Sequence, residues 1–192
     1  MYNINKNNYN KNPKNSTVYT PESVVQRIYE VVKQSRLQPT VVLDPSVGNG
    51  NLLQPFKGVK KIGVDVDNVG RKIVNQLIHK KYEDTKITDY KWMPDLVIAN
   101  PPFNGCSGRK LYTEVFLRQT VELFGNVPIV MITPYGLRLN QKIASPRWQW
   151  IRDHTQITGI MSLPLDVFQG VKFHSEVLFF NLPRIKAHYF MN

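Results

Sequence analysis

Residues 41–50 have the sequence VVLDPSVGNG: an apolar strand, then a carboxylate, then a loop with two glycines. Such a segment is typical of the first strand-to-helix turn of an α/β domain, where a ligand lies at the carboxyl end of the strand. It is neither a dinucleotide fingerprint, because Leu53 takes the third glycine position, nor a P-loop, because no Gly-Lys-Ser/Thr follows. An acid here would repel a pyrophosphate. We therefore expect Asp44 to face a cationic or hydrogen-donating ligand group, with a tight structural turn as the alternative.

Outward from this segment, further short apolar runs end in turn residues and indicate strands. Their continuous Val, Ile and Leu content is typical of a parallel sheet that is covered on both faces. The sequence therefore predicts an α/β fold of the Rossmann-like, doubly wound type, with a mostly parallel seven-stranded sheet and helices on both faces. The predicted strands are 40–43, 61–66, 85–88, 95–99, 128–132, 157–163 and 176–181.

The intervening segments carry helical patterns. The first helix follows Thr20-Pro21-Glu22, where Thr would cap the helix and Pro suits its first turn, and its apolar residues keep helical spacing to about residue 34. Gly125 is placed where a helix C-cap glycine belongs. Further helices are predicted at 50–56, 68–80, 109–124 and 145–154.

Composition narrows the class of protein. The 192 residues suffice for one domain, and 42% apolar residues exclude wholesale disorder. No apolar run approaches the ~18 residues of a membrane span, and no secretory signal opens the chain. The single Cys106 cannot form an internal disulfide or a cysteine metal site, so we expect a cytoplasmic protein without a structural metal.

Charge points to the kind of partner. Lys and Arg exceed Asp and Glu by 25 − 14 = 11, which favours a polyanion such as nucleic acid; ordinary solubility charge is the alternative. Residues 1–15 hold seven Asn, three Lys and no acid. We predict a disordered basic arm there, followed by one domain over residues 16–192.

The second predicted strand also ends in acids, in the segment IGVDVD at residues 62–67. In doubly wound nucleotide sites, an acid about twenty residues after the first loop accepts hydrogen bonds from ribose hydroxyls. By its place in the strand, Asp65 is the better candidate for this role. Asp67 is expected to be a solvated turn residue.

A third strand end has unusual chemistry, in the segment LVIANPPFNG at residues 96–105. Two prolines cannot continue a central strand, so the chain leaves the sheet there in a stiff loop. Asn100 and the proline carbonyls supply acceptors, and Phe103 supplies a flat apolar face. The arrangement suits an exocyclic amine on a planar base.

Together these motifs resemble the S-adenosylmethionine-dependent amino-methyltransferases of the gamma arrangement, which modify N6 of adenine in DNA. Within that group, the sequence resembles the modification subunits of type I restriction systems and their single-chain relatives. The NPPF of residues 100–103, with the glycine loop 50 residues upstream, carries most of the resemblance, which spans about residues 16–182. It implies a methyltransferase fold, S-adenosylmethionine as cofactor and DNA as partner.

The resemblance also implies roles for single residues. Thr20 would contact the cofactor's carboxylate, although helix capping explains it equally well. Asp44 would pair with the methionyl ammonium, and Asp89 would accept from the cofactor's adenine. The implied cofactor-binding residues are Tyr19, Thr20, Asp44, Pro45, Ser46, Gly48, Gly50, Asp65, Asp89 and Tyr90.

For catalysis, the resemblance places Asn100, Pro101, Pro102 and Phe103 at the target base, with no need for a metal. The side-chain oxygen of Asn100 and the carbonyl of Pro101 would accept the two N–H bonds of the amine. Phe103 would stack on a base flipped out of the duplex. Phe173 would be a second wall or a core residue. Basic residues that could hold phosphates around the cleft, each with a solvated surface charge as the alternative, are Arg109, Lys110, Arg138, Lys142, Arg147 and Arg152.

Family members usually carry a separate target-recognition region of ~100 residues or more, large enough for a second domain. Here the chain ends about ten residues after its last predicted strand. We therefore expect that a specificity subunit or a homo-oligomer completes recognition, or that targeting is loose. Alternative substrates are an RNA base or a protein glutamine, for which related enzymes carry NPPY. A non-catalytic cofactor- or DNA-binding subunit is the remaining alternative.

Overall fold

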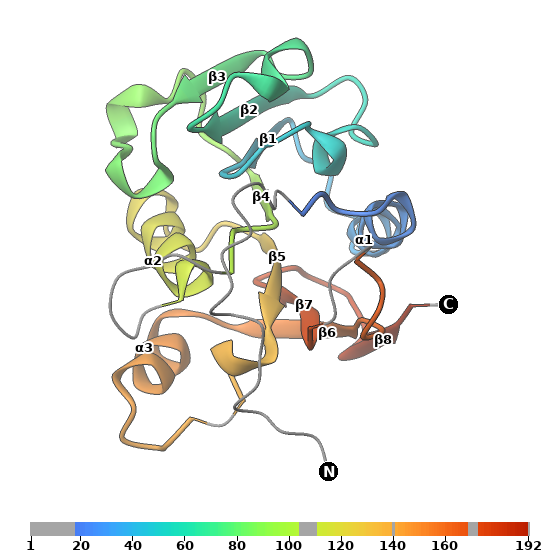
Figure 1. The fold of residues 1–192 in the computed structure, drawn as a ribbon, viewed down its shortest axis with the longest axis vertical. Coiled ribbons are helices and arrows are strands. Elements are labelled where there is room, and N and C mark those ends of the chain that lie inside the picture. The colour runs from blue at the N-terminus through green and yellow to red at the C-terminus, as the bar shows by residue number, and fades with distance from the viewer. Residues whose placement is uncertain (1–17, 104–110, 140, 169–172, 192) are drawn as a thin grey trace.

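Strand β1 (Val41–Asp44), predicted from the glycine-loop segment, lies inside an eight-stranded sheet (Figure 1). The computed structural model describes residues 18–103, 111–139, 141–168 and 173–191, so the predicted arm, Arg109 and Lys110 lie outside the described residues. The other strands are β2 (Lys60–Asp65), β3 (Gln76–His79), β4 (Leu96–Ala99), β5 (Ile129–Pro134), β6 (Ile157–Ser162), β7 (Ser175–Phe180) and β8 (His188–Phe190).

The strand order is β3-β2-β1-β4-β5-β7-β6-β8. All neighbours pair in parallel except β7, which runs antiparallel to both β5 and β6. The predicted mostly parallel α/β sheet is therefore confirmed, with eight strands in place of seven. The sequence missed two strands: β3, and β8, a three-residue strand that pairs with β6 at the sheet edge.

The order of the strands locates the place where a ligand fits. From β1 the chain moves outward to β2 and β3, then returns to lay β4 on the other side of β1. This reversal is the topological switch point of an open sheet, where a crevice forms beyond the carboxyl ends of the two strands. The ends of β1 and β4 therefore bring the Asp44 and Asn100 segments to one edge.

Helices cover both faces of the sheet, as predicted (Figure 1). On one face, α1 (Glu22–Gln34) buries its predicted apolar stripe against side chains such as Val42 and Ile98. On the other face, α2 (Tyr112–Phe124) and α3 (Pro146–His154) contribute to a second apolar cluster that includes Leu43 and Val97.

Gly125 ends α2 with a positive φ of 64°, which confirms the predicted C-cap. Among the described residues, no helix combines the length and the apolar content needed to cross a membrane.

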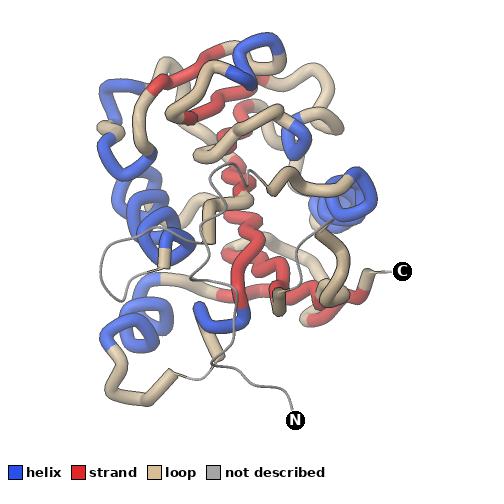
Figure 2. The backbone as a smooth tube through the Cα atoms, viewed as in Figure 1, coloured by secondary structure: helices blue, strands red, loops and turns tan. Residues whose placement is uncertain are grey.

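The segment between β2 and β4 differs most from the prediction, and in Figure 2 it consists largely of loops and short helical turns. The predicted helix 68–80 is wrong: a short 3-10 helix (Val69–Lys72) precedes β3. Its apolar spacing was helical, but Asn75 exchanges two hydrogen bonds with Lys61 of β2 and starts a strand pairing that replaces the helix.

Two further predictions for this half of the chain were wrong. The predicted strand 85–88 is occupied by irregular chain and part of a 3-10 helix (Ile87–Asp89), because β3 already occupies the sheet edge beside β2. The predicted helix 50–56 shortens to a 3-10 helix (Asn51–Leu53), which follows a left-handed residue at Gly50.

Candidate functional site

The carboxylate of Asp44 ends β1 and is almost completely buried, with 2% of its surface exposed. Burial is the main reason that its pKa rises to about 7; the nearby charge of Asp65 adds to the rise, and a 3.0 Å hydrogen bond from the backbone N–H of Ser46 opposes it. No ion pair joins Asp44 to a cation among the described residues. A cationic group placed beside it would stabilise the ionised form.

The glycine loop is held by Asp65 at the end of β2. One carboxylate oxygen accepts from the backbone N–H of Gly48 at 2.7 Å, and the other accepts from the N–H of Asp67 at 3.0 Å. A carboxylate has about four lone-pair positions, so about two remain for a ligand's hydroxyl groups. Asp65 thus has a structural contact that the sequence did not predict, and it keeps acceptor capacity for the predicted one.

Both loop glycines are required by the backbone, with φ of 45° at Gly48 and 80° at Gly50. The space that a Cβ would occupy is taken up by the protein itself. A Cβ on Gly50 would lie 2.8 Å from the side chain of Ile73, and one on Gly48 would lie 3.3 Å from the ring of Tyr19. The ring of Tyr19, a predicted cofactor-binding residue, therefore lies against the glycine loop, and 45% of the surface of Tyr19 is exposed to solvent.

The remaining predicted loop residues, Pro45 and Ser46, are buried and half-buried, respectively. Both lie beside Asp44.

Asn100 follows β4 and has its side-chain amide fixed in one orientation. The amide nitrogen donates to the backbone carbonyl of Val18 at 3.3 Å and to the hydroxyl of Thr20 at 3.1 Å. Among the described residues, its oxygen Oδ1 accepts no hydrogen bond. Pro101 is buried and Pro102 is exposed, so the prolines carry the chain from the core to the surface within two residues.

Thr20 does not cap α1. The N-cap residue is Pro21, no side chain caps this end, and the hydroxyl of Thr20 accepts the hydrogen bond from Asn100. The backbone carbonyl of Thr20 accepts from the side-chain amide of Asn51 at 3.0 Å. The capping interpretation was therefore wrong, and Thr20 instead joins the loop after β1 to the loop after β4.

Two aromatic residues predicted for the substrate side meet directly. The rings of Phe103 and Phe173 contact edge to face, with centroids 4.8 Å apart. Phe173 also stacks at 5.3 Å on Phe168, which is buried in the core. Phe173 therefore packs against the core and contacts Phe103, and its role as a wall for a target base stays a prediction.

Asp89 and Tyr90 lie beside β3, where their polar groups already have partners. Asp89 forms an ion pair with Lys80 at 2.7 Å and accepts from the N–H of Lys86, and the bond to Lys80 is the main reason that its pKa falls. The hydroxyl of Tyr90 donates to Thr85, and burial raises the pKa of Tyr90 to about 12. Among the described residues, no hydrogen bond, ion pair or ring contact joins this pair to the residues around Asn100.

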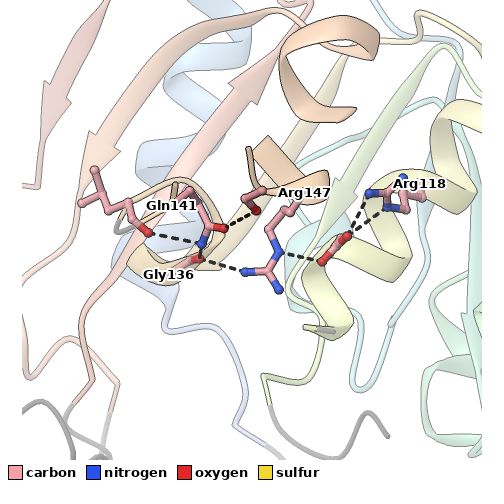
Figure 3. A network of polar contacts seen from close by, with 7 residues as sticks. Arg118, Gly136, Gln141 and Arg147 are labelled. Atoms are coloured by element: carbon pink, nitrogen blue, oxygen red, sulfur yellow. Dashed lines mark hydrogen bonds and ion pairs between the residues drawn. The ribbon is translucent and has the colours of Figure 1, made fainter. Parts of the chain in front are cut away.

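Three of the arginines predicted near phosphates form ion pairs. Arg147 from α3 and Arg118 from α2 flank the buried carboxylate of Glu114, and Arg147 also donates to the carbonyl of Gly136 (Figure 3). Arg138 forms two hydrogen bonds with buried Glu176, and Arg152 pairs with Asp153.

The contacts of Arg138 and Arg147 hold the loop after β5 in place, and each of the three arginines has a carboxylate partner. In the described part of the chain, no cluster of three or more His, Cys, Asp or Glu side chains has the geometry to hold a metal ion.

Solved structures share this fold. A type I restriction-modification methyltransferase subunit from Streptococcus thermophilus is 19% identical and has a TM-score of 0.68, with 90% of this chain and 47% of that chain covered. The M protein of the type I restriction enzyme EcoKI is 15% identical at a TM-score of 0.62, covering 88% and 46%.

A protein from Listeria monocytogenes assigned to the class I S-adenosylmethionine-dependent methyltransferases is 17% identical at a TM-score of 0.63, covering 89% and 64%. The chain thus spans about half the length of the two restriction-system subunits. No family model and no curated protein matches the sequence. At these identities the likeness establishes a shared fold, and the methyltransferase fold implied by the motifs is confirmed.

Proposed function

We propose that this chain is an S-adenosylmethionine-dependent methyltransferase domain that modifies the exocyclic N6 amine of adenine in DNA. The observation that carries the proposal is the orientation of Asn100. Its amide nitrogen is occupied by Val18 and Thr20, while its oxygen is unpaired among the described residues. A side chain held in this way at the end of β4 presents an acceptor, which is what a weakly nucleophilic amine requires.

The residues at the ends of β1 and β2 fit the cofactor. Asp44 is a carboxylate whose pKa is raised mainly by burial, and the cofactor's ammonium would supply a counter-charge that favours its ionised form. Asp65 keeps acceptor positions for ribose hydroxyls beyond the two that hold the loop. When bound, S-adenosylmethionine supplies an electrophilic methyl group.

The protein's part in the chemistry is to orient and activate the amine. The lone pair of an adenine amine is delocalised into the ring, so the nitrogen attacks poorly until that conjugation is broken. Oδ1 of Asn100 and the carbonyl of Pro101 accept its two N–H bonds and direct the lone pair out of the ring plane. These acceptors bind more strongly as positive charge develops on the nitrogen, so they stabilise the transition state more than the ground state.

DNA as substrate is supported by the net charge of +11 and by the comparison with restriction-system subunits. A duplex hides the amine, so the adenine must leave the stack, at a cost of a few kcal/mol. Stacking on Phe103, which is backed by Phe173, returns about 1–3 kcal/mol. Sequence recognition by a partner subunit is part of the same proposal, because two of the compared proteins come from type I restriction systems and one of them is a methyltransferase subunit.

The test is transfer of a labelled methyl group from S-adenosylmethionine to DNA, RNA and protein, followed by identification of the modified base. We expect N6-methyladenine in DNA. Asn100→Ala should keep cofactor affinity and lose at least about 100-fold in turnover, the scale seen when one transition-state hydrogen bond is removed. If the label is found in RNA or in a glutamine side chain, that molecule and not DNA is the substrate. Undiminished turnover of Asn100→Ala would contradict the role of Asn100.

A further inference from the structure

The segment Val18–Thr20 lies across the ends of two strands. Through its carbonyl, Thr20 accepts from Asn51 in the loop after β1, and through its hydroxyl it accepts from Asn100 in the loop after β4. Val18 adds a second acceptor for the same amide nitrogen. One short stretch of chain therefore contacts both loops that form the candidate site.

These contacts decide which end of the Asn100 amide faces outward. The carbonyl of Val18 has no proton to donate, so only the amide nitrogen can face it. If the Asn100 amide were reversed, its Oδ1 would face the carbonyl oxygen of Val18, and its nitrogen would point at the substrate. A reversed amide would donate where the target amine needs an acceptor.

The hydroxyl of Thr20 is poorly placed to serve a ligand itself. Thr20 is 4% exposed, and its Oγ1 receives the amide hydrogen of Asn100 at 3.1 Å. Because this hydroxyl accepts from the Asn100 amide, it helps to hold that side chain in place. Loss of the hydroxyl would free one amide hydrogen of Asn100 and loosen its rotamer without removing a group from the substrate.

We propose that Thr20 is a positioning residue for methyl transfer: together with the carbonyl of Val18, it holds the Asn100 amide with Oδ1 directed at the target amine. The proposal rests on the proposed function and names a residue that acts on turnover through Asn100. It differs from a contact between Thr20 and the cofactor's carboxylate, because that contact would act on cofactor affinity.

The experiment compares Thr20→Val, which has the same shape without the hydroxyl, with Thr20→Ser, which keeps it. We expect kcat to fall about 10-fold in Thr20→Val, equivalent to about 1.4 kcal/mol, with the affinity for S-adenosylmethionine unchanged. Thr20→Ser should restore most of the turnover. Thr120→Val is the matched control. The buried hydroxyl of Thr120 contacts the hydroxyl of Tyr82 and the backbone carbonyl of Phe116, and no described residue of the candidate site.

A second measurement does not depend on activity. The side-chain amide protons of Asn100, assigned by their loss in Asn100→Ala, should change chemical shift and exchange faster with solvent in Thr20→Val than in the wild type. They should remain close to wild type in Thr20→Ser and Thr120→Val. Unchanged amide resonances with unchanged kcat in Thr20→Val would overturn the proposal, as would a loss of cofactor affinity at constant kcat.

The outcomes separate the two levels of inference. A wild-type chain that labels no DNA, RNA or protein contradicts the proposed function. A wild type that transfers methyl groups, beside a Thr20→Val variant with the same kcat, contradicts the positioning role alone.

Discussion

Replacing Asp44 by Asn should stabilise the fold while it weakens cofactor binding. Burial raises the pKa of Asp44 from 3.8 to about 7, so keeping this carboxylate ionised in the folded chain is unfavourable at neutral pH. At 1.36 kcal/mol for each pKa unit, the penalty is about 4 kcal/mol. The asparagine amide avoids it but buries an N–H₂ group, whose missing partners cost about 1–3 kcal/mol. We expect a net gain of about 1–3 kcal/mol in the free energy of unfolding above pH 7.

The pH dependence identifies the cause of this gain. Because the folded pKa lies above the unfolded value, the folded chain binds more protons than the unfolded chain between about pH 4 and pH 7. Raising the pH through this window therefore lowers the stability of the wild type, and the Asp44→Asn variant lacks this loss. The variant should be no more stable than the wild type near pH 4, and its advantage should reach full size above pH 7.

Urea denaturation at several pH values measures this difference, and thermal unfolding should show roughly 2–4 °C for each kcal/mol in a domain of this size. Asp67→Asn, which changes an exposed acid near the same loop, is the matched control; it keeps Asp44, so the pH dependence of its stability should follow that of the wild type. An Asp44→Asn variant that is less stable than the wild type at every pH would refute the reasoning, because the carboxylate would then be ionised without penalty.

Calorimetry checks the functional half of the same prediction. A bound ammonium lowers the pKa of Asp44, so cofactor binding near pH 6.5 should release a large fraction of a proton, seen as a dependence of the binding heat on the buffer. The Asp44→Asn variant should bind more weakly and release none. Equal affinity and equal proton release in both proteins would place the ammonium site elsewhere.

Two further substitutions test the loop. Asp65→Ala removes the acceptor for the N–H groups of Gly48 and Asp67, so we expect weaker cofactor binding in calorimetry and a loss of about 1.5–3 kcal/mol in stability; unchanged affinity would move the ribose site. Gly50→Ala places a Cβ 2.8 Å from Ile73 at a φ of 80°, and should destabilise the fold by about 1–2 kcal/mol from backbone strain alone. Adding Ile73→Ala should relieve the steric overlap with the new Cβ but not the backbone strain at residue 50. A double variant as stable as the wild type in denaturation would contradict a contribution from backbone strain.

The sequence was informative wherever structure depends on local pattern. The apolar stripe of α1 and the strand-acid-glycine order around Asp44 gave the right elements, because burial imposes a period of 3.6 on a helix and continuous apolar residues on a strand covered on both faces. It failed at residues 76–79, where pairing with β2 outweighs a helical apolar pattern. A single sequence contains no signal for the bonds that Asn75 forms with Lys61, and those bonds decide the outcome.

The candidate site shows the same limit more sharply. The motifs named Asn100 and Thr20 separately, yet the bond between them joins residues 80 positions apart, and only the fold reveals it. The ion-pair partners of the arginines could not be predicted either, since Arg138 pairs with Glu176, which lies 38 residues away on β7. Residue type and spacing identified which chemistry is present, and three-dimensional neighbours decided which groups remain available for a ligand.

The availability of these groups is itself an argument for function. Folding stability alone does not favour a buried carboxylate without a counter-ion at Asp44, because a neutral side chain of the same shape would be more stable there at neutral pH. Nor does it favour an amide at Asn100 whose nitrogen is satisfied and whose oxygen has no partner among the described residues. The two lie at the ends of adjacent strands, at the switch point of the sheet. A cationic group near β1 and an N–H donor near β4 would satisfy both. The ammonium of S-adenosylmethionine and the exocyclic amine of a base have these properties.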